Sequence, residues 1–217
     1  MAFGKKEETL AVITPANIVR ATLSIKGTAP FVQHKFSQKA RLAMMEKMST
    51  PAAAKKSKSV RAVRDYDNEF VEAQHISTDG WVGIPCPAFR AAMIDACRLA
   101  GLVMTKAKMS VFVIPDGFDK DDGTPLVRLY STKGPEKHEG LVRLETGVAD
   151  VRIRPMWREW AAQVTIEYDA DMITGESVIN LLDRAGRQVG VGEGRPFSKN
   201  SVGQGWGTFT VVEGAQS

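Results

Sequence analysis

An apolar segment in the middle of the chain constrains the fold most strongly. Residues 83–101 read GIPCPAFRAAMIDACRLAG, and only three polar side chains interrupt the part that follows Pro87. Proline is compatible with the first turn of a helix, and Gly101 with its end. A helix with so few polar residues must be covered over most of its surface. We therefore expect residues 87–100 to form a helix packed against a sheet.

Four segments with a strand-like apolar pattern provide such a sheet. In residues 18–25 apolar side chains alternate with polar ones, so that Val19 and Ile25 share one face. The other segments are residues 110–114, 161–168 and 207–212. A second helix is expected over residues 175–185, because Thr174 can cap its start and its apolar residues form one stripe.

These elements occur in the order strand, helix, strand, strand, helix, strand. This βαββαβ order predicts an α+β fold with a modified ferredoxin-like (RRM-like) core. We expect one domain of 217 residues, with its core at residues 15–30, 67–115 and 158–217. Two insertions interrupt it, a basic helical insertion at residues 31–66 and a β-rich insertion at residues 116–157.

The insertions carry local patterns of their own. The basic insertion is expected to hold a helix at residues 35–48 and then an alanine- and lysine-rich stretch. Residues 69–76 and 81–84 are expected to form a hairpin around the turn at 77–80. Further expected strands lie at residues 126–130, 141–144 and 150–154, and residues 131–140 are expected to form a polar loop.

Composition narrows the cellular setting. No apolar run approaches the roughly 20 residues of a membrane helix, so no membrane partner is expected. The first residues lack the apolar region of a signal peptide, and the chain has only two cysteines, Cys86 and Cys97. The sequence thus predicts a cytoplasmic protein with free thiols.

Positive charge is concentrated in one segment. Residues 35–64 hold nine basic residues and one acid, Glu46, so this segment carries +8 while the rest of the chain carries −4. Such a segment on a nearly neutral body favours a polyanionic partner. A solvated tail is the alternative interpretation.

Seven glycines among basic and aromatic residues mark residues 186–207, GRQVGVGEGRPFSKNSVGQGWG. No Gly-Lys-Ser/Thr ends this glycine-rich run, and no helix follows it, so neither a Walker loop nor a dinucleotide fingerprint fits. We interpret it as a flexible basic loop that follows a phosphate backbone and leads into the last strand. A long glycine-rich hairpin or an oligomer contact remains the alternative.

Two motifs in this order resemble the RAMP superfamily, the ferredoxin-like RNA-binding proteins that form the backbone of CRISPR effector complexes. The first is Ile84-Pro85 leading into a helix with Arg90, and the second is the glycine-rich run before the last strand. The resemblance covers about half of the chain. It implies a protein that lines up along RNA or single-stranded DNA by polymerising, with a phage or another mobile element as a possible source.

Basic and aromatic residues of these regions are the candidate nucleic-acid contacts. Cations release counterions when they neutralise phosphates, and aromatic rings stack on bases. For Arg90 a salt bridge is the alternative, and for the aromatic residues core packing is. The candidates are Lys55, Lys56, Lys58, Arg61, Arg64, Arg90, Arg187, Arg195, Phe197, Lys199 and Trp206.

Catalysis has weaker support in the sequence. Some RAMP relatives cleave RNA with a histidine after the first strand, where this chain has His34, but a general base needs a partner that the sequence does not show. The acidic turn at residues 116–122 lacks the calcium-loop spacing and is interpreted as solvated. His75 and His138 have no ligand spacing to each other. No enzyme activity, metal or cofactor is therefore expected.

The sequence as a whole favours a non-enzymatic protein that coats RNA or single-stranded DNA through backbone contacts. It would act as a homo-oligomer, a filament or a subunit of a ribonucleoprotein complex. Two alternatives remain open, a structural or assembly protein of a phage-like element and a metal-independent endoribonuclease that uses His34.

Overall fold

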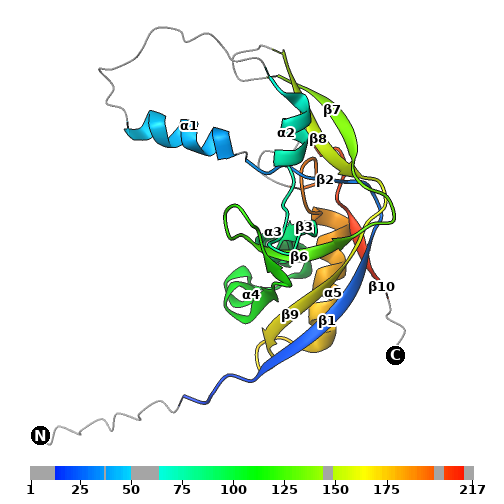
Figure 1. Ribbon diagram of the computed structural model, residues 1–217. Helices are drawn as coiled ribbons and strands as arrows, with labels where there is room; N and C mark the ends of the chain where they lie inside the picture. Colours follow the sequence, from blue (N-terminus) through cyan, green and yellow to red (C-terminus); the bar gives the residue numbers. More distant parts are fainter. Residues whose placement is uncertain (1–12, 37, 50–63, 144–148, 198–202, 213–217) are drawn as a thin grey trace, which may run out of the picture.

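The computed structural model describes residues 13–36, 38–49, 64–143, 149–197 and 203–212 (Figure 1). Within these ranges the fold is α+β, and seven strands form the main sheet while three form a second sheet. Every strand pair in both sheets is antiparallel. The α+β class expected from the sequence is confirmed.

The main sheet pairs its strands in the order β10-β1-β9-β6-β3, with β4 paired to β9 and β5 to β6. Their bounds are β1 (Ile18–Gly27), β3 (Gly83–Pro85), β4 (Val111–Ile114), β5 (Gly117–Phe118), β6 (Pro125–Tyr130), β9 (Ala161–Asp169) and β10 (Phe209–Val212). All four strands predicted for the core are present, although the last one begins at residue 209 rather than 207.

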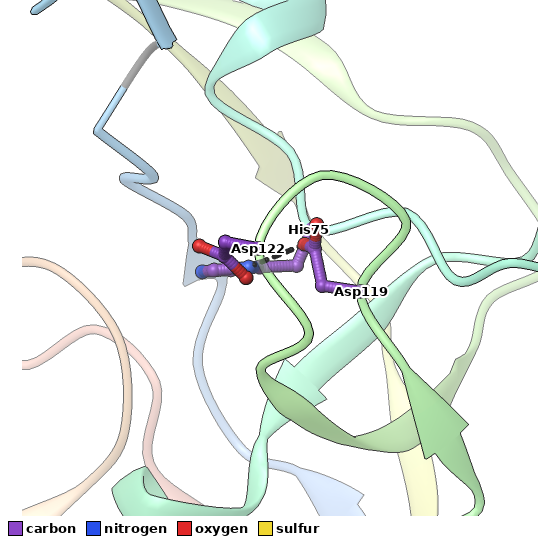
Figure 2. A group of neighbouring side chains, drawn as sticks. All are labelled: His75, Asp119 and Asp122. Atoms are coloured by element: carbon purple, nitrogen blue, oxygen red, sulfur yellow. Dashed lines mark hydrogen bonds and ion pairs between the residues drawn. The ribbon is translucent and has the colours of Figure 1, made fainter. Parts of the chain in front are cut away.

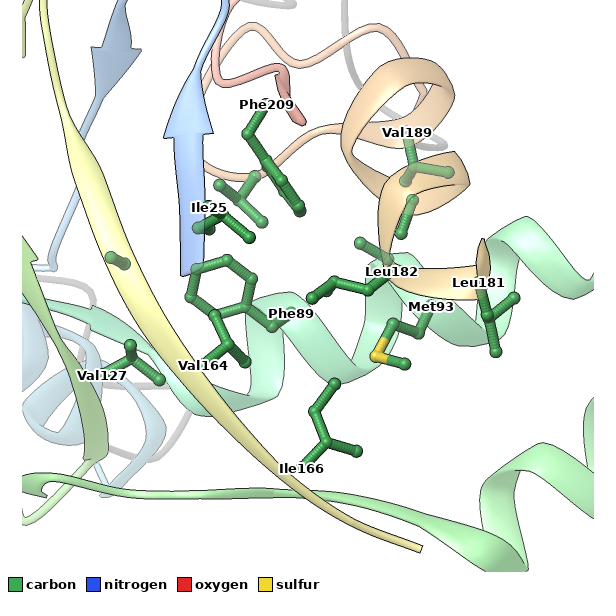
Figure 3. Packing of buried hydrophobic residues seen from close by; sticks show 14 of the residues in the cluster. Ile25, Phe89, Met93, Val127, Val164, Ile166, Leu181, Leu182, Val189 and Phe209 are labelled. Carbon is green, nitrogen blue, oxygen red and sulfur yellow. The ribbon is translucent and has the colours of Figure 1, made fainter. Parts of the chain in front are cut away.

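Helices α3 (Cys86–Ala100) and α5 (Gly175–Arg184) pack on one face of this sheet. Figure 3 shows Phe89 and Met93 of α3 and Leu182 of α5 beside Val164 and Ile166 of β9. All five side chains are buried. Burial of side chains of this size stabilises the fold by about 1.5–3 kcal/mol each, so this layer is the main hydrophobic core.

Local signals explain where the two helices begin and end. Pro87 lies in the first turn of α3, and Gly101 ends that helix in the left-handed conformation, with φ of 69°. The Thr174 hydroxyl accepts a hydrogen bond from the Ser177 N–H at 3.2 Å and so caps α5. A π-helical turn (Ala185–Val189) continues α5, so the helical chain runs beyond the end expected at residue 185.

The opposite, outer face of the main sheet is polar along β1 and β9. Arg20 pairs with Glu167 at 2.7 Å, and the hydroxyls of Thr22 and Thr165 lie 3.0 Å apart. This agrees with the alternation in residues 18–25, because these residues lie opposite the apolar ones that face the helices.

The second sheet combines β2 (Phe31–Val32), β8 (Ala149–Trp157) and β7 (Glu136–Arg143). Strands β7 and β8 form a long hairpin that rises above the main sheet in Figure 1. The expected polar loop at residues 131–140 is thus too long, because its second half pairs with β8. The polar residues 136–140 gave no apolar alternation from which a strand could be predicted, because few of them are buried.

The expected hairpin arm at residues 69–76 is wrong, because its first half belongs to helix α2 (Tyr66–Glu72). The Asp65 carboxylate caps this helix by accepting from the Asn68 N–H at 3.0 Å. Only an isolated bridge between Ile76 and Val82 remains of the hairpin. Helix α4 (Met104–Ser110) was also not expected.

Helix α1 (Gln38–Ser49) projects from the body in Figure 1, as expected for an insertion. The insertion begins later than residue 31, however. Phe31 is 1% exposed and belongs to the main core, and Gln33 and Lys35 are buried as well. In the described ranges, no helix is long and apolar enough to cross a membrane.

Candidate nucleic-acid interface

The described part of the glycine-rich run is packed into the protein instead of forming a free loop. Gly207 has φ of 65°, and a Cβ at this position would collide with the Val191 carbonyl oxygen. A Cβ on Gly192, with φ of 82°, would lie 2.5 Å from the Val32 oxygen. The glycines therefore allow close backbone contact, which corrects the expectation of a flexible loop.

Backbone hydrogen bonds attach the run to the chain that leads into α1. The Glu193 N–H donates to the Val32 oxygen at 2.9 Å, and the Gly207 N–H donates to the Pro30 oxygen at 2.7 Å. Two regions that the sequence predicts to bind nucleic acid are thus held side by side, although more than 150 residues separate them in the chain.

Side chains reinforce this junction at Glu193. Its carboxylate accepts from Arg154 Nε at 2.7 Å and lies 3.7 Å from His34 Nδ1. The His34 ring in turn contacts the Phe36 ring, with centroids 5.1 Å apart. Burial, together with the positive charge of Arg154, lowers the pKa of His34. The imidazole is therefore neutral at neutral pH, and it connects the glycine-rich run to the base of α1.

Three of the predicted contact residues gather around the run. The Trp206 ring lies against Gly194 and meets the His138 ring edge to face, with centroids 4.9 Å apart. The neighbouring Arg195 donates to the Gly192 oxygen at 2.9 Å. Phe197 is 44% exposed, and the Arg98 guanidinium lies 6.0 Å from its centroid. The core-packing alternative thus holds in part for Trp206 and less for Phe197.

Three other predicted arginines are held by intramolecular partners, and one of them, Arg187, lies at the start of the run. Arg64 binds Glu69 and Asp150, each at 2.7 Å, and the hydrogen bond with Glu69 is the main reason why the pKa of Arg64 is raised. Arg187 donates to Asp183 at 2.6 Å. These guanidinium groups join separate segments of the fold, which is a structural role.

Arg90 also has a structural role in this geometry. Its guanidinium donates to the Val111 oxygen at 2.9 Å and to the Lys108 oxygen, and it lies 5.0 Å from the Phe112 ring centroid. The partners are backbone carbonyls at the end of α4, not the acid that the sequence analysis considered. Lys55, Lys56, Lys58, Arg61 and Lys199 lie outside the described residues.

A buried charged cluster below α1 was missed from the sequence. Lys35 Nζ donates to Asp119 at 2.7 Å and to Asp121 at 2.6 Å, and His75 Nδ1 lies 2.8 Å from Asp119. Burial alone would lower the pKa of Lys35, but the hydrogen bonds to Asp119 and Asp121 outweigh it and raise that pKa. The acidic turn is therefore not simply solvated, since the Asp119 side chain is fully buried.

The same cluster contains a potential metal-ligand set. His75, Asp119 and Asp122 point toward one another in Figure 2, and their donor atoms lie within 4.8 Å of each other. Burial lowers the pKa of His75, which leaves the ring neutral and able to bind a metal. The Lys35 ammonium already supplies positive charge to Asp119, however, and would repel a cation. The cluster is best explained as an anchor for the start of α1.

No family model matches this chain, and no curated protein matches it either.

Proposed function

We propose that this protein binds RNA or single-stranded DNA through phosphate contacts made by the basic segment and the glycine-rich run, without catalysis. The observation that carries the proposal is the junction at Glu193. It holds the run, with Arg195 and Phe197, beside the chain that enters α1. A strand that contacts the run would therefore also lie near the start of the basic segment at Lys35.

The arrangement of the main sheet supports the proposed RAMP-like, modified ferredoxin-like core. Strands β1, β4, β9 and β10 pair in the order β10-β1-β9-β4, so the two βαβ halves interleave around the central pair. Helix α3 follows β1 and helix α5 follows β9, as the βαββαβ order requires. Fold alone does not assign function, so the proposal rests on the interface.

Helix α1 favours assembly along the strand. Leu42, Met45 and Met48 are 60%, 62% and 87% exposed, and together they give a projecting helix an uncovered apolar surface. Exposed apolar groups of this kind are typical of protein contact surfaces. A neighbouring subunit on the same strand would cover them, which gives the side-by-side oligomer.

Fluorescence anisotropy with a labelled single-stranded oligonucleotide tests the proposal. We expect binding that weakens steeply with salt, with a slope of about −0.7 per phosphate neutralised. The variant Lys55→Gln/Lys56→Gln/Lys58→Gln should bind more weakly and show a shallower slope. The matched control Lys106→Gln/Lys108→Gln/Lys133→Gln removes the same charge elsewhere and should bind like the wild type.

Two results would contradict the proposal. The first is a wild-type protein that shows no salt-sensitive binding to either RNA or DNA strands. The second is an equal loss of affinity in the two triple-lysine variants, because binding would then depend on the net charge of the protein and not on the basic segment.

A ribonuclease that uses His34 is the second candidate, because its neutral ring is about one-third exposed and lies beside the Arg154 cation. A neutral imidazole can accept a proton from a 2′-hydroxyl, and a cation can stabilise the charged phosphate. Metal-free incubation with labelled RNA tests it. Cleavage that disappears in His34→Ala would establish this activity, and intact RNA would exclude it.

A further inference from the structure

A groove of about 930 Å³ crosses the outer face of the main sheet, away from the glycine-rich run. It is lined by β1, β6 and β9, by the turns that follow β6 and precede β9, and by Trp81 and Val212. Among the described residues, none of those predicted to contact nucleic acid lines it.

The strand register explains why this face is hollow. Lys26 of β1 pairs with Ala161 of β9, and Ala161 pairs with Tyr130 of β6, so these three side chains form one row across the sheet. The small alanine in the middle leaves space between a lysine and a tyrosine. Gln163 and Ser24 form the neighbouring row and supply hydrogen-bonding groups to the floor.

One wall of the groove holds an arginine between two aromatic rings. The Arg128 guanidinium lies 5.9 Å from the Trp81 centroid and 5.4 Å from the Tyr130 centroid. Trp81 is held in place because its ring covers Gly83 and Gly117, where a Cβ would lie 2.9 Å and 2.7 Å from it. Stacking of this kind fixes a guanidinium while leaving its N–H groups available.

The charged groups of the groove have few partners of their own. Within the described residues, neither the Arg128 guanidinium nor the Lys26 ammonium makes a hydrogen bond or ion pair, and Glu159 is the one acid in the lining. This differs from Arg64, Arg90 and Arg187, whose guanidinium groups are all engaged. The groove therefore combines two available cations with exposed aromatic surface.

We propose that this groove binds nucleotides of a single-stranded nucleic acid, with a base stacked on Tyr130 and phosphates bound by Arg128 and Lys26. The ligand must be anionic and must also carry flat apolar rings, because the lining offers both kinds of contact. This inference rests on the proposed function and extends it. The chain then contacts a strand on two surfaces, through phosphates at the glycine-rich run and through both bases and phosphates at the groove.

Two oligonucleotides of equal length, one normal and one abasic, separate base contacts from phosphate contacts. Tyr130→Leu removes the ring and retains apolar volume, so we expect it to weaken binding of the normal strand roughly 5-fold or more. Binding of the abasic strand should be the same in wild type and Tyr130→Leu. Arg128→Gln should weaken binding of both strands, because it removes a phosphate contact.

Phe118→Leu is the matched control, since Phe118 is an aromatic side chain that is 52% exposed and lies outside the groove. It should bind both strands like the wild type. Circular dichroism of each variant checks that the fold is retained.

The results distinguish failure of this inference from failure of the proposed function. If the wild type binds the normal strand but Tyr130→Leu and Arg128→Gln bind it equally well, the groove is not a nucleotide site and the proposed function stands. If the wild type binds neither strand, both this inference and the proposed function are contradicted. If Tyr130→Leu changes the sedimentation of the free protein, a second copy fills the groove and the inference is overturned.

Discussion

At the scale of single residues, the most consequential pair is Lys35 with Asp119. Both are buried, and the Asp119 carboxylate also contacts His75. Replacement of Lys35 by methionine would remove the ammonium that pairs with the buried Asp119 carboxylate and leave the neutral His75 ring beside it. Removal of one partner of such a pair costs about 3–5 kcal/mol. We expect Lys35→Met to lose about 3 kcal/mol of unfolding free energy in urea titrations.

The control for this prediction is Lys120→Met, which removes an exposed lysine from the same acidic turn. Exposed positions of this kind change stability by less than about 0.5 kcal/mol. Equal stability of Lys35→Met and Lys120→Met would show that the cluster contributes nothing to folding.

Stability should also depend on pH through two histidines. Burial lowers the pKa of His34 and His75 in the folded protein, so below about pH 6.5 the unfolded chain binds protons more readily. The unfolding free energy should therefore fall as pH drops through about 6.5. His34→Gln/His75→Gln should flatten this decline between about pH 7 and pH 5 in urea titrations, because glutamine does not titrate.

Asp119 makes the stability of the protein depend on pH over a second, more acidic range. Burial would raise the pKa of Asp119, but its hydrogen bonds, first of all with Lys35, lower it. The stability that depends on this ionised carboxylate is complete above about pH 4 and is lost below that value.

For the prediction on His34 and His75, His138→Gln is the control, because it removes a histidine elsewhere in the fold. The pH dependence would not come from His34 and His75 if the unfolding free energy of His34→Gln/His75→Gln fell as steeply with pH as that of the wild type and of His138→Gln.

At the scale of elements, the glycine-rich run offers an internal comparison. Gly205 and Gly207 both have positive φ, 78° and 65°, but only Gly207 is in close contact with another segment. Gly205→Ala should cost about 1 kcal/mol, the strain of a left-handed alanine. Gly207→Ala adds a collision with Val191 and should cost at least about 3 kcal/mol.

Thermal and urea unfolding of the two glycine variants measure this difference. Equal losses of unfolding free energy in the two variants would mean that the run can move away from Val191 at no energetic cost. The run would then not be packed tightly against this segment.

The elements also show how far the sequence predicts the fold. Helices α3 and α5 were predicted because each carries its own start signal and one apolar surface. Residues 69–76 were predicted to be a strand because they precede the turn sequence at 77–80, whereas the Asp65 cap and the acidic first turn stabilise helix α2. The Lys35–Asp119 pair joins residues 84 apart, and no local pattern can reveal such a contact.

The candidate site shows the same division between local and distant signals. The glycine-rich run was recognised from its composition, but its packing depends on Val32 and Pro30, which lie far away in the chain. The sequence around Arg128 is an ordinary strand pattern and does not indicate a binding residue. Its importance follows only from the strand pairing that places it beside Trp81 and Tyr130.

At the scale of the whole molecule, the proposed function assigns separate tasks to the body and to helix α1. The body carries the glycine-rich run and the outer groove on an antiparallel sheet. Helix α1 contributes charge and an uncovered apolar surface, so subunits bound to one strand would contact each other through it. Binding of a long strand should therefore be cooperative, while binding of a strand that fits one subunit should not.

The variant Leu42→Gln/Met45→Gln tests this division, because it removes apolar surface from α1 without changing charge. We expect unchanged affinity for a short oligonucleotide and loss of cooperative binding to a long one, measured by anisotropy and by sedimentation of the complexes. Leu99→Gln/Met109→Gln is the matched control, since these residues are 59% and 79% exposed on α3 and α4. If both pairs leave cooperativity intact, subunits meet through another surface, and the exposed residues of α1 have a different partner.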